Sequence, residues 1–292
     1  MSGADEEPTS APAKPAPAPA APSPDDPAVA AERRARFEQV AGPGQLHAAV
    51  LALLLTPGRN REMAVWRDEC RHTVGAKELR NELMKVSSPE RMPWLERFVG
   101  RIAQGPLDKR QALLRAVRRL IAADGRALAL DRLRWLALRH ALGDVKALAL
   151  PAAAEVELEG LATGTAQQIG RLSAFLSRIV PSPEIDLDLA SGTATSGERW
   201  WRDVMQPWPD AGATRDMPDA NALVGALHDV QALPWMLRPV LVRRWVDAAV
   251  TLSPAGQLAA PAAEALRIAA RLLDCPLPPA VAACFVEVGS AG

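Results

Sequence analysis

Asp124 and Asp131 are the carboxylates of this 292-residue chain whose positions best suit a divalent cation. Asp124 lies in an Asp-Gly turn between two predicted helices, and Asp131 lies early in the second helix. A hard cation needs about six oxygen ligands, and neighbouring acids at suitable spacing are absent from this stretch. Turn closure by Asp124, and the helix dipole at Asp131, explain both acids without a metal. We expect these structural roles and keep the two aspartates as weak metal candidates.

Four tryptophans are the candidate residues for binding another protein: Trp200, Trp201, Trp208 and Trp235. Adjacent residues of a helix point about 100° apart, so the first two can both be buried only if the helix is covered from two sides. The glycines and prolines around them limit local packing. An exposed tryptophan here would be a candidate hot spot for a partner, and a place in the core is the competing interpretation.

The sequence contains no local catalytic, cofactor-binding or metal-binding motif. The four histidines are far apart, and none begins a His-Glu-x-x-His motif: His47, His72, His140 and His228. Three cysteines without Cys-x-x-Cys spacing indicate free thiols rather than a disulfide framework or a zinc site. We therefore expect no cofactor and no catalysis. An enzyme whose site is assembled from distant residues, between two helical modules, stays open as an alternative.

Charge and hydropathy exclude several kinds of partner. Basic and acidic residues balance at 34 each, so the chain has no overall attraction for nucleic acid, despite an arginine-rich stretch from 115 to 139. The longest apolar run, Leu46–Leu55, is about half a membrane span and contains His47. The N-terminus lacks the basic and apolar segments of a signal peptide. These features predict a cytoplasmic protein with no transmembrane segment of its own.

Apolar residues recur with a helical period from residue 45 onward, which predicts an all-α fold. Residues 1–41 are rich in proline and alanine and lack this period, so we expect a disordered arm. Helices are expected at 44–56, 61–72, 76–86, 89–104, 107–123, 128–142 and 151–180, and then at 197–205, 219–230, 234–252, 257–273 and 279–286. Prolines, acids and small polar residues mark 181–196 as a linker.

A helix–turn–helix pattern occurs twice, at Arg115–Gly143 and at Leu241–Cys275. The first turn contains Asp124, whereas Ala255 stands at the matching position of the second. The second copy therefore cannot repeat whatever the acid does in the first. We expect two related helical modules, at 42–180 and 197–288, the second one degenerate.

The Ala-Ala-Asp-Gly-Arg motif at 122–126 resembles the TerB-like, tellurite-resistance-associated helical domain, in which an Asp-Gly turn links two helices. Leu237–Pro279, with its Glu-Ala-Leu-Arg at 264–267, resembles the cytosolic C-terminal region of bacterial HtpX-type membrane metallopeptidases. Arg110–Leu142 resembles the earlier repeat of that region. Those peptidases carry a His-Glu-x-x-His zinc helix and transmembrane helices, and this chain has neither. The resemblance implies the accessory region without the peptidase domain.

These observations predict a non-catalytic protein-interaction or regulatory module. The resemblance implies a protein partner in an envelope-stress system, with a membrane metallopeptidase as the example, and a place at the inner face of the membrane through that partner. One alternative is a module that responds to divalent cations, centred on Asp124. The other is the unrecognised enzyme with a site between the two helical modules.

Overall fold

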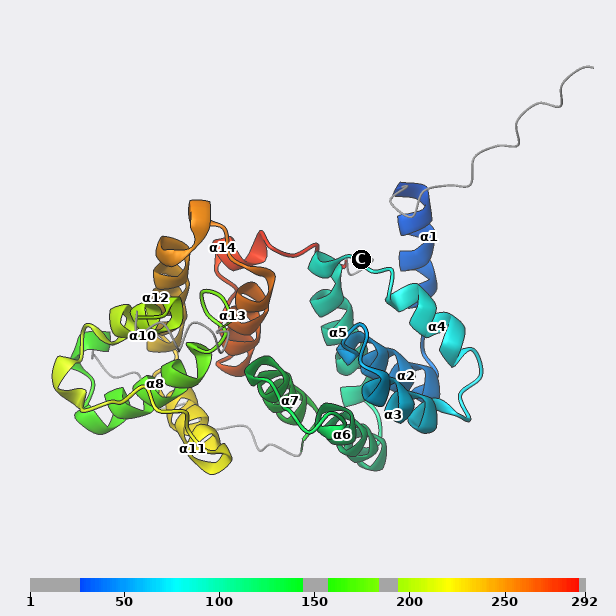
Figure 1. The fold of residues 1–292 in the computed structure, drawn as a ribbon, viewed down its shortest axis with the longest axis horizontal. Coiled ribbons are helices and arrows are strands. Elements are labelled where there is room, and N and C mark those ends of the chain that lie inside the picture. The colour runs from blue at the N-terminus through cyan, green and yellow to red at the C-terminus, as the bar shows by residue number, and fades with distance from the viewer. Residues whose placement is uncertain (1–26, 144–156, 184–193, 289–292) are drawn as a thin grey trace, which may run out of the picture. The chain divides into compact units, whose positions relative to one another are not determined.

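The computed structural model describes residues 27–143, 157–183 and 194–288, and its contacts divide the chain into residues 1–39 and residues 40–292. Every regular element in these ranges is a helix, as Figure 1 shows, which confirms the predicted all-α class. In the same ranges, no helix combines the length and the apolar composition needed to cross a bilayer.

Helix α1 (Pro27–Glu38) lies in the first of these two units and corrects the expected extent of the arm. The composition predicts an irregular chain through residue 41, but residues 27–38 of that segment are helical. Its sequence explains the difference, because proline suits the first position of a helix and the following alanines, glutamate and arginines are good helix formers. The proline-rich stretch before it, residues 1–26, lies outside the described residues.

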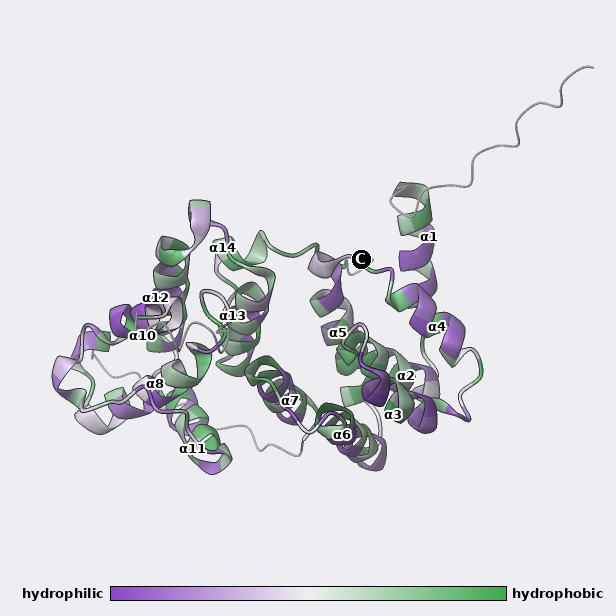
Figure 2. Ribbon diagram, viewed as in Figure 1, coloured by the Kyte–Doolittle hydropathy of each residue, from purple (hydrophilic) through white to green (hydrophobic). Residues whose placement is uncertain are grey.

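The second unit begins with a set of helices that we call the N-terminal helix group: α2 (Pro43–Leu54), α3 (Asn60–Cys70), α4 (Ala76–Leu83), α5 (Ser88–Ala103), α6 (Leu107–Ala122) and α7 (Ala129–Leu142). Helix α2 contacts α3, α4, α5 and α6, and nearly all of its residues from Leu46 onward are buried. A helix that is apolar around its whole circumference is stable only when covered on all sides. The colouring in Figure 2 separates this apolar helix from the hydrophilic α4.

The C-terminal helix group follows: the 3₁₀ turn η1 (Leu158–Gly160), α8 (Thr163–Leu176), α10 (Ser196–Met205), η2 (Pro209–Ala211), α11 (Ala220–Gln231), α12 (Leu237–Leu252), η3 (Pro254–Gly256), α13 (Ala260–Leu272) and α14 (Pro279–Ala282). Its core includes Trp200 of α10 and Trp245 of α12. The indole of Trp200 donates to the backbone oxygen of Trp245 at 3.0 Å, and the indole of Trp245 donates to Ser173 Oγ at 3.0 Å. Three helices are thus joined around two buried indoles.

The contacts of α8 differ from the expected division at residues 181–196. The sequence predicts one helix over 151–180 that belongs to the first module. In the structure α8, which lies within this range, contacts α10, α11 and η2 of the C-terminal helix group. In the described part, 157–180, the expected helix is interrupted, with η1 separated from α8 by two extended residues. Gly160 and Gly164 lie on either side of the break, and glycine disfavours the helical conformation. Residues 151–156 and most of the expected linker lie outside the described residues.

Both predicted helix pairs are present, since α6 contacts α7 and α12 contacts α13. Their turns differ in backbone conformation. In the first turn Gly125 has a left-handed φ of +70°, whereas in the second both Ala255 and Gly256 are left-handed, with φ of +53° and +67°. Alanine adopts this conformation at a cost because its Cβ approaches the backbone. Helix α13 contacts α5 and α7 as well as α12, and so joins the two helix groups.

Candidate functional site

Arg134 of α7 links the two helix groups through Glu264 of α13. Its Nε and Nη2 donate to the two oxygens of Glu264 at 2.5 and 2.9 Å, and its Nη1 lies 3.6 Å from Asp131. Burial alone would lower the pKa of Arg134, but the hydrogen bonds and the charge of Glu264, with further attraction from nearby acids, raise it. A guanidinium held by both oxygens of one carboxylate fixes the orientation of both helices.

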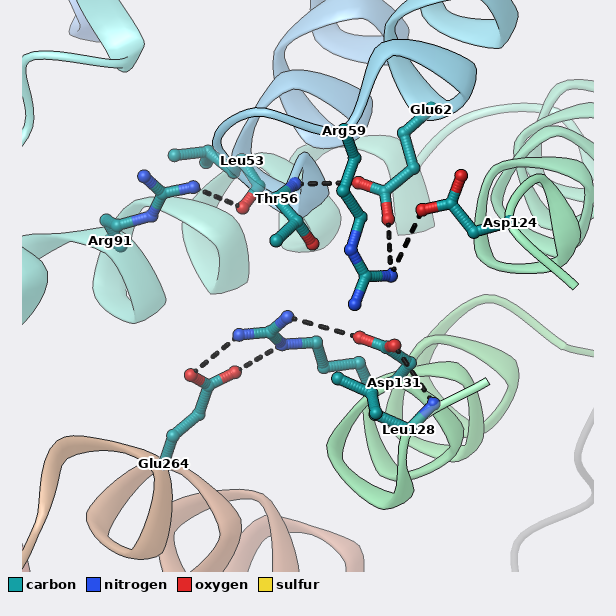
Figure 3. A network of polar contacts seen from close by, with 10 residues as sticks. Leu53, Thr56, Arg59, Glu62, Arg91, Asp124, Leu128, Asp131 and Glu264 are labelled. Carbon is teal, nitrogen blue, oxygen red and sulfur yellow. Dashed lines mark hydrogen bonds and ion pairs between the residues drawn. The ribbon is translucent and has the colours of Figure 1, made fainter. Parts of the chain in front are cut away.

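A second arginine, Arg59, ties the Asp124 turn to the start of α3 (Figure 3). Its Nη1 lies 3.0 Å from Glu62 Oε1 and 3.4 Å from Asp124 Oδ2. The other oxygen of Glu62 accepts a hydrogen bond from the backbone N–H of Thr56 at 2.7 Å. Glu62 is therefore a buried acid whose two oxygens are both used in holding the loop between α2 and α3.

These contacts give the two candidate metal ligands structural roles. Asp124 pairs with Arg59, and Asp131 accepts a hydrogen bond from the backbone N–H of Leu128 at 3.2 Å while its other oxygen faces Arg134. An arginine beside each carboxylate competes with any cation. Nowhere in the described ranges do three His, Cys, Asp or Glu side chains gather closely enough to hold one metal ion.

An open pocket of about 890 Å³ lies beside this network, between α5, α7, α13 and α14. Most of its lining is apolar and includes Leu55, Met92, Leu95, Leu130, Leu258 and Phe285. The charged side chains in the lining are Arg91, Arg134 and Glu264. We call it the α5–α13 pocket. Sequence reasoning missed it because its walls come from five helices, α2, α5, α7, α13 and α14, and from loops beside them, which are distant in the chain.

Arg91 enters the pocket lining from α5 (Figure 3). Its Nη2 donates to the backbone oxygen of Leu53 at 2.8 Å. Its remaining N–H groups have no acceptor among the described residues, in contrast to Arg134, which is held by two carboxylates. Burial and the positive charge of Arg134 lower the pKa of Arg91, and Glu264 partly offsets this. Arg91 is thus a cation that forms no ion pair with a carboxylate among the described residues.

The segment after α14 closes one side of the pocket. Phe285 contributes to the lining. The backbone N–H of the next residue, Val286, donates to the backbone oxygen of Pro89 at 3.2 Å. Glu287 then accepts a hydrogen bond from Nη1 of Arg267 at 2.8 Å. The Arg267 guanidinium also lies 4.7 Å from the centre of the Phe285 ring. The C-terminal segment is therefore attached to α5 and α13 by three separate contacts.

Arg267 is the most deeply buried charge of this region, with 2% of the residue exposed. Its Nε and Nη2 donate to the two oxygens of Glu96 on α5 at 2.9 and 2.6 Å. Burial by itself would lower the pKa of Arg267, but hydrogen bonds to Glu96 and Glu287 raise it above its ordinary value. Arg271 also reaches Glu96, at 2.7 Å. This cluster forms a second ion-paired link between α5 and α13.

Two of the four candidate tryptophans are buried, as the competing interpretation of a place in the core would have it. Trp200 is fully buried, and Trp208, whose indole donates to the backbone oxygen of Leu158 at 3.1 Å, is 7% exposed. Trp201 is partly buried and donates to the backbone oxygen of Gly170 at 3.0 Å. Helix α10 is covered by α12 and by α8, which is the two-sided burial that adjacent tryptophans require. Only Trp235 of the four is strongly exposed, at 58%.

The pocket has no pair of groups suited to catalysis. Its described lining contains no histidine, and the carboxylate of Glu264 is held by Arg134. Burial raises the pKa of the one lining thiol, Cys284, which keeps it protonated and a poor nucleophile. No family model, curated protein or solved structure matches this chain.

Proposed function

We propose that this protein is a non-catalytic interaction module that binds a protein partner through an exposed apolar patch at the start of α12. The patch consists of Trp235, Met236 and Val240, which are 58%, 47% and 45% exposed. We call it the Trp235 patch. The exposure of Trp235 is the observation that carries the proposal, since the indoles of Trp200 and Trp245 are fully buried.

The physical argument rests on the cost of leaving such side chains in water. Tryptophan offers a large apolar area with few rotatable bonds, so covering it contributes strongly to affinity. Met236 is flexible and polarisable and adapts to irregular partner surfaces. Arg243 lies about one helical turn after Val240 and is exposed, so it can supply a charged contact at the rim. The patch thus combines an aromatic anchor, an adaptable neighbour and a polar edge.

The kind of partner follows from the resemblance of Leu237–Pro279 to the cytosolic region of HtpX-type metallopeptidases. The Trp235 patch immediately precedes and enters this stretch. A separately encoded membrane metallopeptidase, or another component of an envelope-stress system, is the partner that we propose. Such a partner would bring the protein to the inner face of the membrane.

The two alternatives receive less support from the geometry. A cation-responsive module centred on Asp124 would need free carboxylate oxygens, but Arg59 lies 3.4 Å from one of the two oxygens of this acid and competes with a cation there. An enzyme with a site between the helix groups would use the α5–α13 pocket, whose lining is mainly apolar. A titration with calcium or magnesium would revive the first alternative if it raised the melting temperature of the wild type and not of Asp124→Asn.

A site-directed crosslink tests the proposal. Benzoylphenylalanine placed at position 235 in native cells should give, on illumination, an adduct with a membrane protein that mass spectrometry identifies as a metallopeptidase or envelope component. The same group at Val74, which is 89% exposed on the loop before α4, is the matched control. No adduct from position 235, or the same adducts from both positions, would refute the patch as the docking surface.

A pair of variants supplies an independent measurement. Trp235→Ser/Met236→Ser should abolish co-purification of the crosslinked partner, whereas Val74→Ser should retain it. All of the replaced side chains are exposed, so the melting temperature should stay close to that of the wild type. Full retention of the partner by the double variant would contradict the proposal.

A further inference from the structure

We propose that the α5–α13 pocket binds a small amphipathic molecule with one carboxylate, which Arg91 holds while the apolar walls cover the rest of the ligand. This inference concerns a ligand and a surface different from the Trp235 patch. It rests on the size of the pocket, on its charge and on the unused hydrogen-bond donors of Arg91.

The pocket has the dimensions and lining of a ligand site. Its volume of about 890 Å³ falls within the range of roughly 300–1,000 Å³ that is usual for small-molecule pockets. Leucines, methionine, prolines and alanines from both helix groups form most of the wall, and a few polar groups converge on it. Apolar walls with a small number of placed polar groups are the usual means of binding a molecule with an extended hydrocarbon part.

The charges of the lining select the sign of the ligand. Arg134 and Glu264 neutralise each other through two hydrogen bonds, which leaves Arg91 as the unbalanced charge among the described residues of the lining. One anionic group would neutralise it, whereas a cationic ligand would be repelled. A single carboxylate therefore fits the site better than a neutral head, which would leave Arg91 without a counter-charge.

The geometry of Arg91 favours a carboxylate in particular. The Leu53 carbonyl holds Nη2, and the other N–H groups of the planar guanidinium have no acceptor among the described residues. A guanidinium presents its donors in a fork that matches the two oxygens of a carboxylate. The contact with Leu53 also restricts the side chain before a ligand arrives, which lowers the entropy lost on binding.

The C-terminal segment supplies the wall that distinguishes this pocket from an open groove. Cys284 and Phe285 line it, and the contacts of Val286 with Pro89 and of Glu287 with Arg267 hold them in place. Cys284 is partly exposed at this wall, so its reactivity can report whether the pocket is filled. Cys275 is also partly exposed but does not line the pocket, and it provides an internal control.

The first experiment measures thiol protection in the full-length protein. Decanoate, decanol and decyltrimethylammonium carry the same hydrocarbon chain with an anionic, neutral or cationic head, and each is added below its critical micelle concentration. Alkylation of Cys284 and of Cys275 by iodoacetamide is then followed by mass spectrometry. We expect decanoate to slow alkylation of Cys284 alone, with the other two compounds at least about tenfold less effective at equal concentration. Equal protection by all three, or no protection by decanoate, would overturn the proposal.

Three variants locate the binding. Arg91→Gln should weaken decanoate binding, measured by calorimetry, by about tenfold or more, because it removes a charge-assisted hydrogen bond. Arg132→Gln removes an exposed arginine of the neighbouring α7 and should bind like the wild type. Ala260→Phe places a ring at an exposed position of the pocket lining and should also weaken binding.

Two binding results with these variants would refute the proposal. If Arg91→Gln binds decanoate with wild-type affinity, Arg91 does not hold the carboxylate. If Ala260→Phe binds decanoate with wild-type affinity, the ligand does not lie in the α5–α13 pocket. If Arg91→Gln fails to fold, Ala260→Phe and Cys284 protection still separate the two outcomes, since neither disturbs the contact between Arg91 and Leu53.

Discussion

Replacing Glu96 by glutamine removes the main counter-charge of the buried Arg267. The substitution keeps the size of the side chain and one acceptor oxygen but removes the negative charge. Arg267 is 2% exposed, so water cannot take the place of the lost charge. We expect a loss of stability much larger than that from the same substitution at Glu287, the other acid that holds this guanidinium.

The difference in magnitude follows from exposure. Removing one partner of a buried ion pair costs about 3–5 kcal/mol, and the remaining contacts of Arg267 with Glu287 and with the new amide oxygen reduce this to roughly 2–3 kcal/mol. The side chain of Glu287 is 65% exposed, so solvent screens its pair with Arg267 and we expect less than about 1 kcal/mol for Glu287→Gln.

Thermal unfolding followed by circular dichroism measures both effects. For a chain of this size 1 kcal/mol shifts the melting temperature by about 2–4 °C, so Glu96→Gln should lower it by roughly 4–12 °C and Glu287→Gln by less than about 4 °C. The double variant Glu96→Gln/Arg267→Met removes the stranded cation and should recover part of the loss. Equal shifts for the two single variants would refute the assignment of Glu96 as the dominant partner.

Further tests use the same helices and measurements. Gly170→Ala should destabilise the protein by about 1–3 kcal/mol in urea unfolding, because the new Cβ would lie 2.6 Å from the Cβ of Ala213. The control Gly164→Ala lies on the same helix, meets no atom within 4 Å and should be neutral or stabilising. Losses of stability of equal size in the two variants would contradict this contact. Trp235→Phe should remove most of the tryptophan fluorescence that acrylamide quenches readily, and unchanged quenching would show that this indole is covered. The hydrogen bond from Arg267 lowers the pKa of Glu287 below its ordinary 4.5, although burial opposes this shift. The ion pair therefore contributes its full stability to the folded protein above about pH 4.5, and this contribution disappears as the pH falls through the lowered pKa of the folded state. The melting temperature of Glu287→Gln should therefore fall less than that of the wild type between about pH 5 and pH 3, and parallel curves would argue against this ion pair.

The helices were largely predictable because their signals are local. The start of α5 at Ser88, close to Pro89, and the end of α7 at Leu142, before Gly143, follow from residues that begin or stop a helix within one turn. The expected helix over 151–180 failed because apolar spacing alone did not account for Gly160 and Gly164, which disfavour a continuous helix.

The site was far less predictable because it depends on which helices meet. Arg134 and Glu264 are 130 positions apart, and nothing near either residue indicates the other. Trp200 and Trp201 illustrate the same limit. Their sequence neighbours left exposure and a place in the core both open, and the contacts of α8 and α12 on both sides of their helix decide between the two. Side chains of one type therefore acquire different roles through contacts that no local pattern encodes.

The two ion-paired links of α13 have opposite polarity, and this constrains how the protein can evolve. Helix α13 offers the acid Glu264 to an arginine of α7, and less than one turn later it offers the base Arg267 to an acid of α5. Reversing the charge at either position alone would place like charges together in a site with little water. Substitutions that preserve the fold should therefore arise in matched pairs, and co-variation of Arg134 with Glu264, and of Glu96 with Arg267, would be its signature in related sequences.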